Sequence, residues 1–241
     1  GFEISLVYPA YTGLKNEVLK NIGDISVPIG TKATWRFNTE FVDALEIKFG
    51  QDRIQSKQTG ERAFEYSKNL TQSTPYSIQV FNKKVKDFDS VQYSIQIIPD
   101  IHPTINVMEY KDSLNTSLRY YSGDLSDDYG IARLLFHYRI ASRDTNGKEN
   151  DKVFSKPIPF NGVRNASFIH NISMKELNLQ PGDELSYYFE VWDNDAVNGS
   201  KHTRSGIYTY KMPTIEQLEK QTDQNNKEIK KDLAASVKDA K

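Results

Sequence analysis

Apolar and polar side chains alternate most regularly over residues 179–195, LQPGDELSYYFEVWDND. After a Pro-Gly turn, one side of this segment carries Leu185, Tyr187, Phe189 and Val191, and the other carries Ser186, Tyr188, Glu190 and Trp192. Strict alternation of this kind predicts a β-strand with one face packed against a core. The acidic turn at residues 193–195 predicts that the strand ends in a surface loop.

The same period of two recurs along the chain in two sets of short runs. The first set includes runs around Trp35 and Ile47, and the second includes a run around Phe136, with turn-forming residues between the runs. About seven short strands per set, separated by turns, are typical of an immunoglobulin-like sandwich. We therefore predict an all-β fold of two tandem immunoglobulin-like β-sandwich domains, over residues 1–100 and 101–213.

The boundary between the two predicted sandwiches falls in the segment IPDIHP at residues 98–103, where two prolines restrict the backbone. After Pro213 the period changes from two to that of a helix, and Ile215, Leu218 and Ile229 fall near one stripe. We expect residues 214–241 to begin a polar C-terminal helix that continues beyond this sequence.

Charge and composition exclude several classes of partner. The chain has 31 basic and 32 acidic residues, a net charge of −1, and the two signs are mixed along it. Because binding to phosphates needs a clustered basic surface, we expect no nucleic-acid partner and no adhesion to anionic lipid. No apolar run approaches the roughly 18 residues of a membrane-spanning helix. Any membrane attachment is therefore expected from a segment missing from this chain.

Catalytic motifs are absent from the sequence. There is no cysteine, which removes thiolate nucleophiles, thiolate metal sites and disulfides together. The four histidines lack a zinc-binding spacing, and no nucleophile elbow, P-loop or dinucleotide-binding glycine motif occurs. We therefore predict that the chain is not an enzyme, has no catalytic residues and needs no cofactor other than the calcium considered next.

Five carboxylates are expected to gather at one pole of the second sandwich. In the immunoglobulin strand order, the loop SGDLSDDYG at residues 122–130 and the loop after Trp192 lie at the same pole. An all-oxygen cluster suits calcium. The candidate metal ligands are Asp124, Asp127, Asp128, Asp193 and Asp195. The alternative is that these aspartates cap turns through backbone amides, while Lys201 and Arg204 supply positive charge.

The outward face of the same sandwich carries a second group of candidate residues. Two strands are expected to present Leu135, His137, Tyr188 and Trp192 on one side of the sheet. Aromatic rings beside a histidine could stack on a sugar or a peptide, so these four are the candidate ligand-binding residues. The alternative is that another protein segment covers this face, as is common for exposed apolar patches.

Four motifs carry a resemblance to a known family: YPAYTG from Tyr8, GDISVPIGTKATW from Gly23, SGDLSDDYGI from Ser122 and YYFEVWDNDAVNGSKHTRS from Tyr187. Across both predicted sandwiches and the start of the helix, the chain resembles the large envelope proteins of Bacteroidetes-type bacteria grouped as domain of unknown function 4175. The resemblance implies transmembrane helices before Gly1, a periplasmic ectodomain anchored in the inner membrane, and a long helical region after the end of this sequence. The family has no established catalytic residues to transfer.

Together these observations predict a non-catalytic periplasmic segment of a membrane-anchored protein, acting as a scaffold or binding an envelope protein partner. The alternative is a carbohydrate- or peptide-binding module that uses Tyr188 and Trp192 and is stabilised by calcium at the acidic pole.

Overall fold

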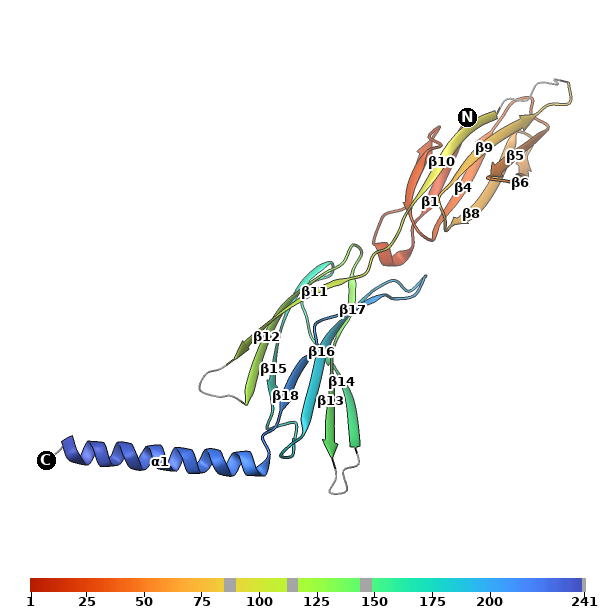
Figure 1. Ribbon diagram of the computed structural model, residues 1–241. Coiled ribbons are helices and arrows are strands. Elements are labelled where there is room, and N and C mark those ends of the chain that lie inside the picture. The colour runs from red at the N-terminus through yellow and green to blue at the C-terminus, as the bar shows by residue number, and fades with distance from the viewer. Residues whose placement is uncertain (85–89, 112–116, 144–148, 240–241) are drawn as a thin grey trace. The chain divides into compact units, whose positions relative to one another are not determined.

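The computed structural model describes residues 1–84, 90–111, 117–143 and 149–239 (Figure 1). Strands dominate, and one long helix follows them, so the predicted all-β class with a C-terminal helix is confirmed. The chain divides into two compact units. The first comprises Gly1–Pro103, Asp127–Ile131 and Asp193–Lys201, and the second comprises Thr104–Ser126, Ala132–Trp192 and His202–Lys241.

The first unit is a sandwich of two five-stranded sheets. One sheet has the order β2 (Glu17–Lys20), β1 (Phe2–Val7), β4 (Thr31–Asn38), β8 (Ala63–Leu70) and β7 (Lys57–Gly60). The other has the order β3 (Ile25–Pro28), β10 (Ser90–Ile98), β9 (Thr74–Phe81), β5 (Ala44–Phe49) and β6 (Asp52–Gln55). A short 3-10 turn, η1 (Ala10–Thr12), follows β1.

Trp35 lies at the centre of the first core and is fully buried. Its indole Nε1 donates a hydrogen bond to the Tyr76 hydroxyl (3.2 Å), which in turn donates to the Gly23 carbonyl (2.7 Å). Buried indole and phenol groups need such partners, because an unpaired polar group in an apolar core costs free energy. The alternating side chains of β4 and β5 therefore pack as predicted.

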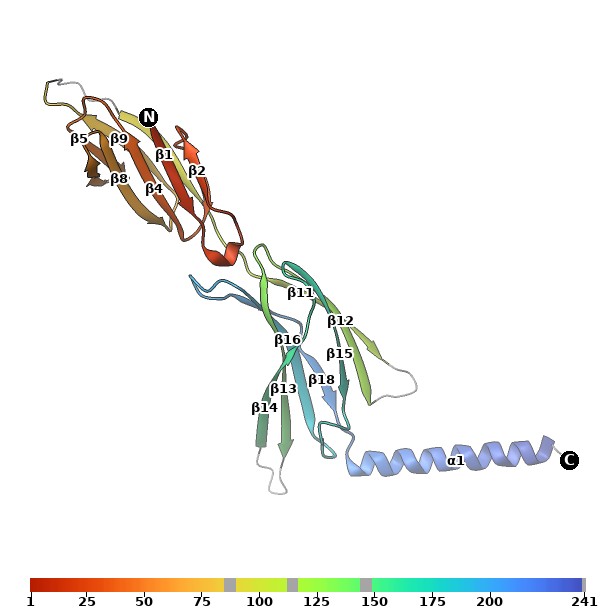
Figure 2. The same cartoon turned by 180° about the vertical axis from the view of Figure 1, so that it is seen from behind.

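The second unit pairs a three-stranded sheet with a larger one (Figure 2). The three-stranded sheet has the order β11 (Thr104–Lys111), β12 (Leu118–Ser126) and β15 (Asn165–Ser173). The larger sheet has the order β14 (Glu149–Ile158), β13 (Ile131–Arg143), β16 (Glu184–Asp193) and β17 (His202–Arg204), and β18 (Tyr208–Lys211) also pairs with β16. Leu134, Phe136, Tyr187 and Phe189 are buried between the sheets, as the alternation predicts.

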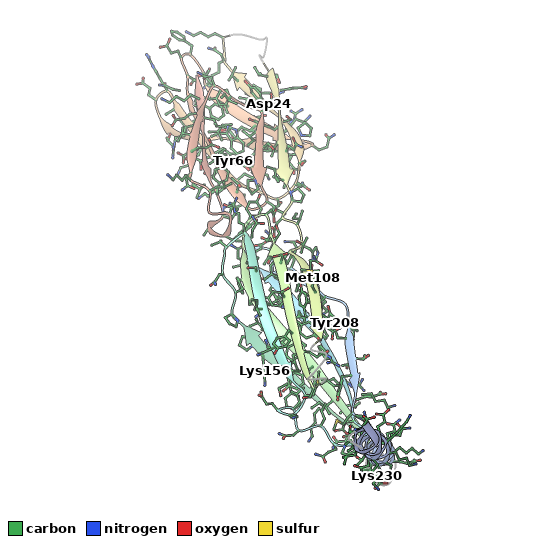
Figure 3. All side chains as sticks on the ribbon, turned by 90° about the vertical axis from the view of Figure 1, so that its left-hand side faces the viewer. Asp24, Tyr66, Met108, Lys156, Tyr208 and Lys230 are labelled. Carbon is green, nitrogen blue, oxygen red and sulfur yellow. The ribbon has the colours of Figure 1, made fainter. Side chains whose placement is uncertain are left out.

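The C-terminal helix α1 (Ile215–Asp239) begins at a capping box. The Gln217 amide donates to the Thr214 hydroxyl (3.3 Å), and the Thr214 amide donates to the Gln217 side-chain oxygen (3.0 Å), so two free helix-end amides are satisfied. In Figure 3 the helix is seen nearly end-on, and side chains such as Lys230 project all around it. Every helix side chain whose burial is described is exposed. Over the described ranges, none of the helices combines the length and the apolarity needed to cross a bilayer.

Candidate functional site

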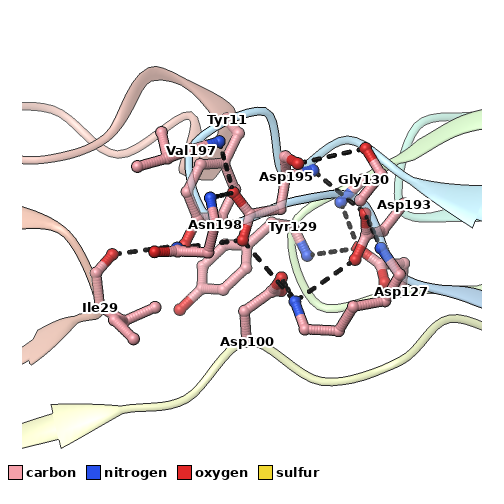
Figure 4. Close-up of polar contacts among 12 residues, drawn as sticks. Tyr11, Ile29, Asp100, Asp127, Tyr129, Gly130, Asp193, Asp195, Val197 and Asn198 are labelled. Carbon is pink, nitrogen blue, oxygen red and sulfur yellow. Dashed lines mark hydrogen bonds and ion pairs between the residues drawn. The ribbon is translucent and has the colours of Figure 1, made fainter. Parts of the chain in front are cut away.

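A dense polar cluster lies in the first unit, where loop residues 127–131 and 193–201 meet (Figure 4). Asp127 Oδ2 accepts hydrogen bonds from the amides of Tyr129 (3.0 Å) and Gly130 (2.6 Å). Asp195 Oδ1 accepts from the amides of Val197 (2.8 Å) and Asn198 (3.0 Å). Aspartates at turn starts bond the backbone in this way, so one part of the cluster caps its own loops.

Further hydrogen bonds join the two loops to each other and to η1. The Asn194 amide donates to the Gly130 carbonyl (3.0 Å), and the Asn194 side-chain amide donates to the Tyr11 carbonyl (3.0 Å). The rings of Tyr11 and Tyr129 meet edge to face, with centroids 5.4 Å apart. The loops are therefore held by tertiary contacts, which fix where their carboxylates point.

Lys201 provides positive charge inside this cluster. Its Nζ forms an ion pair with Asp100 and lies 3.6 Å from both Asp193 Oδ2 and Asp195 Oδ2. Burial alone would lower the pKa of Lys201, but the hydrogen bond from its ammonium to Asp100 and the nearby carboxylates raise the pKa overall. The lysine therefore stays protonated at neutral pH. We call Asp100, Asp127, Asp128, Asp193, Asp195 and Lys201 the aspartate cluster.

The aspartate cluster contains more acceptors than donors. Three of its buried side-chain oxygens, Asp127 Oδ1, Asp128 Oδ1 and Asp193 Oδ2, accept no hydrogen bond among the described residues, and neither does the neighbouring Asn194 Oδ1. Burial raises the pKa of Asp100 to about 6, and the charges of Asp128 and Asp193 add to the effect of burial, although Lys201 opposes it. Burial raises the pKa of Asp127 as well. The cluster thus holds five carboxylates, which partly repel one another, and only three of them lie within 4 Å of the single lysine.

Four of the five predicted metal ligands, Asp127, Asp128, Asp193 and Asp195, lie in this cluster. Asp124 does not, and the prediction for this residue is wrong. The strand β12 extends to Ser126, so Asp124 is still part of the ladder, where it pairs with Asn106 and Ser167 and is exposed on the second unit. Among the side chains that the structure describes, no three His, Asp or Glu residues are grouped as a metal centre. Calcium binding stays a prediction.

The predicted ligand-binding residues lie on the outward face of the larger sheet in the second unit, around a carboxylate that sequence reasoning did not select. Glu190, on β16, is almost fully buried. Its Oε1 accepts from Arg204 Nε (2.7 Å), and its Oε2 accepts from Trp192 Nε1 (2.9 Å) and lies 3.0 Å from His137 Nε2. His202 Nε2 lies 3.7 Å from Oε1. We call these five residues the Glu190 cluster.

The aromatic rings beside Glu190 are covered by other planar groups. The Trp192 ring has His202 stacked at 4.4 Å and the Arg133 guanidinium at 4.2 Å from its centroid. Arg133 belongs to β13 and His202 to β17, the strands on either side of β16, so Trp192 has a planar neighbour on each side.

The Tyr188 ring also has a planar neighbour from the strand on each side. His137 of β13 stacks at 4.9 Å, and Arg204 of β17 lies at 5.0 Å from the ring centroid. Leu135 is half-buried and pairs with Pro157 of β14. The four predicted residues thus share one face, and neither aromatic ring is an open stacking platform for a sugar.

Glu190 could have been found from the sequence, because alternation on β16 places it between Tyr188 and Trp192 on the outward side. Burial alone would raise the pKa of Glu190, but hydrogen bonds from Arg204 and Trp192 lower the pKa overall. The carboxylate is therefore ionised and its oxygens are occupied, which leaves it unsuited to act as a general acid or base.

No protein-family model matches this chain, and no curated protein matches it. Among solved structures, a chicken TCR is 8% identical over 67% of this chain and 91% of its own, with a TM-score of 0.28. The fibronectin(III)-like modules of Clostridium thermocellum CbhA are 13% identical over 81% and 91%, with a TM-score of 0.25. A chimeric titin Z1Z2-Z1Z2 tandem is 13% identical over 81% and 97%, with a TM-score of 0.28. These scores are too low to inform function, and the fold assignment depends on the strand order above.

Proposed function

We propose that this chain is a non-catalytic protein-interaction segment whose partner docks on the outward face of β13, β16 and β17. The observation that supports this most directly is the Glu190 cluster, which holds aromatic and arginine side chains in fixed positions on a half-exposed sheet face. Trp, Tyr and Arg are the residues that most often dominate the energy of protein interfaces.

Pre-organisation is the reason this face suits a protein partner. Free tryptophan and arginine side chains lose rotamer freedom when a partner binds, which costs about 0.5–1.5 kcal/mol for each immobilised side chain. Here Arg133 is already stacked on Trp192, and Arg204 is already bonded to Glu190. Much of this loss of rotamer freedom therefore occurs when the protein folds, before any partner binds.

The charge on this face indicates the chemistry of the partner. Arg133 and Arg204 outnumber the single carboxylate Glu190, so the surface is electropositive, and the Arg204 side chain is 57% exposed. A partner patch that carries carboxylates would be complementary to this face and would associate faster at low ionic strength.

We further propose that the segment belongs to the periplasmic ectodomain of an inner-membrane protein, in which it serves as a scaffold. Only the sequence resemblance to the envelope family supports this location. Protease protection in spheroplasts of the native host would test it, since a periplasmic segment is digested when only the outer membrane is opened.

Site-specific photo-crosslinking tests the interaction face. A benzoylphenylalanine at position 188 of the full-length protein should capture an envelope protein in the native host, and Arg133→Ala should reduce the captured amount. The same probe at the exposed Lys175 position of the second unit is the matched control. Equal adducts at the two positions, or none at position 188, would contradict the proposal.

A further inference from the structure

The outward face of the three-stranded sheet in the second unit differs from the face around Glu190. Strand pairing places its side chains in four rows across the sheet, Thr104–Ser126–Asn165, Asn106–Asp124–Ser167, Met108–Ser122–Ile169 and Tyr110–Tyr120–Asn171. The alternate positions, such as Tyr121 and Phe168, are buried in the core. Met108, labelled in Figure 3, belongs to the third row. The four rows define what we call the open face.

The first two rows of the open face line a groove of about 550 Å³. Its wall is completed by Asn161, which bridges to Ser167 of β15. Ser126 Oγ donates to Asn165 Oδ1 (2.9 Å), whereas Asp124, which also lines the groove, is solvent-exposed. Amide, hydroxyl and carboxylate groups thus lie side by side over one shallow surface.

The third and fourth rows add apolar and aromatic surface beside the groove. Ile169 is 80% exposed, Tyr110 is 53% exposed and Tyr120 is 38% exposed. Tyr110 and Tyr120 are direct cross-strand neighbours on this face, and the Tyr110 hydroxyl donates to Met108 Sδ (3.8 Å) in the adjacent row. A contiguous exposed patch of this kind on a soluble domain indicates a binding surface.

The charges of the residues that line the groove restrict the chemical class of ligand that can bind there. Of the groove-lining residues, Asp124 is the only charged one, and there is no lysine or arginine to hold a phosphate or a carboxylate. A neutral ligand with many hydroxyl groups matches this lining, because each hydroxyl both donates and accepts, as do the asparagine and serine side chains. Tyrosine rings offer flat apolar surface to the C–H face of a pyranose ring.

We propose that the open face binds a neutral oligosaccharide chain, which runs from the polar groove to the tyrosine pair. Along a strand, the row of Asn106 and the row of Tyr110 are four residues apart, which corresponds to about 14 Å. That distance accommodates a short run of linked pyranose units on a nearly flat sheet. Hydrogen bonds to Asn106, Asp124 and Ser167 orient one end, and ring stacking on Tyr120 holds the other.

This site is independent of the protein-interaction face, because it uses the other sheet of the sandwich and shares no residue with the Glu190 cluster. Loss of the photo-crosslink at position 188 would therefore leave the oligosaccharide site untouched, and the reverse also holds.

Isothermal titration of the full 241-residue chain against neutral cello-, xylo-, manno- and chito-oligosaccharides tests the proposal. We expect one of these series to bind, with affinity rising with chain length. Asp124→Ala should weaken binding about tenfold or more, since it removes a charged acceptor, and Tyr120→Ala should weaken it similarly. Glu176→Ala, an exposed carboxylate of the same unit, is the matched control and should leave affinity unchanged.

Three results would overturn the proposal: binding of none of the four series at millimolar concentration, binding that Asp124→Ala and Tyr120→Ala leave intact, or capture of a peptide or protein on the open face in place of a sugar. Both variants alter exposed side chains, so unchanged thermal unfolding will verify that they fold.

Discussion

The two charged clusters of this molecule have opposite imbalances between hydrogen-bond donors and acceptors. In the Glu190 cluster one buried carboxylate is surrounded by Arg204, Trp192, His137 and His202, so donors exceed acceptors. In the aspartate cluster three carboxylates surround Lys201 and two more belong to the same cluster, so acceptors exceed donors. A buried charge is tolerated when its partners satisfy it, and only the first arrangement does so fully. Burial of charge therefore stabilises the second unit and leaves electrostatic strain in the first.

The largest effect should come from removing the lysine of the aspartate cluster. Lys201→Met leaves Asp100 and Asp193 buried without their ion-pair partner, which should cost about 3–5 kcal/mol of unfolding free energy. Chemical denaturation followed by the fluorescence of Trp35 would measure it. Lys175→Met, at an exposed position, is the control. A loss below about 1 kcal/mol, the value of a surface ion pair, would show that the cluster is solvated and that its charges are not strained.

The same variant tests the calcium prediction. Since Lys201 already lies among the carboxylates, we expect wild-type thermal midpoints to be equal in calcium and in chelator. The Lys201→Met midpoint should rise with calcium, because a divalent cation then replaces the missing ammonium charge. A rise in the wild type would instead support calcium as a resident ligand.

Removing the charge of Glu190 should have the next largest effect. Glu190→Gln keeps the shape but converts its hydrogen bonds with Arg204 and Trp192 from charged to neutral, which should cost about 1.5–3 kcal/mol. Glu184→Gln on the same strand breaks only an exposed ion pair with Lys211 and should cost less than about 1 kcal/mol. Equal losses in the two variants would show that the Glu190 cluster adds no stability.

Acidification should change the stabilising contributions of the two clusters in opposite directions. Because burial raises the pKa of Asp100 to about 6 from its ordinary 3.8, its stabilising contribution is complete below about pH 3.8 and is lost as the pH rises through 6. The pKa of Glu190 is lowered, so its contribution is present above its ordinary pKa of 4.5 and is lost as the pH falls below it.

Hydrogen exchange from pH 7 to pH 5 would measure this difference. Amides of residues 127–131 should become better protected at the lower pH, after correction for intrinsic exchange rates, while protection of β16 stays constant. Asp100→Asn removes the titrating group and should abolish the gain. A gain that persists in this variant would assign the effect to another group, such as Asp127, whose pKa is also raised.

The smallest effect is expected from the cation–π pair at the edge of the Glu190 cluster. Arg133→Met keeps an unbranched side chain over the Trp192 ring but removes the charge, at a cost of about 0.5–1 kcal/mol. The thermal midpoint and the Trp192 emission wavelength would report the change. No change in either would indicate that Arg133 points into solvent for most of the time.

The alternation of apolar and polar residues predicts on which face of a strand a side chain lies better than it predicts how deeply that side chain is buried. On β10, Val91 and Ile95 lie on the same side, yet Val91 is half-exposed and Ile95 is buried. Period two determines which way a side chain points, whereas burial also requires the opposite sheet to cover that position. The candidate site shows the same limit: the loop residues Asp127 and Asp193 were identified, but Asp124 was misplaced because β12 continues further than its turn residues suggested.

By itself, the sequence determined the period of each strand, the helix after Thr214 and the grouping of aspartates near two turns, because these depend on neighbours along the chain. Tertiary structure decided that Lys201 lies among the carboxylates and that Glu190 is satisfied by residues from three strands. It also decided that the rings of Tyr188 and Trp192 are covered while Tyr110 and Tyr120 are exposed. Such partnerships join residues distant in sequence, and local patterns of propensity and spacing carry no information about them.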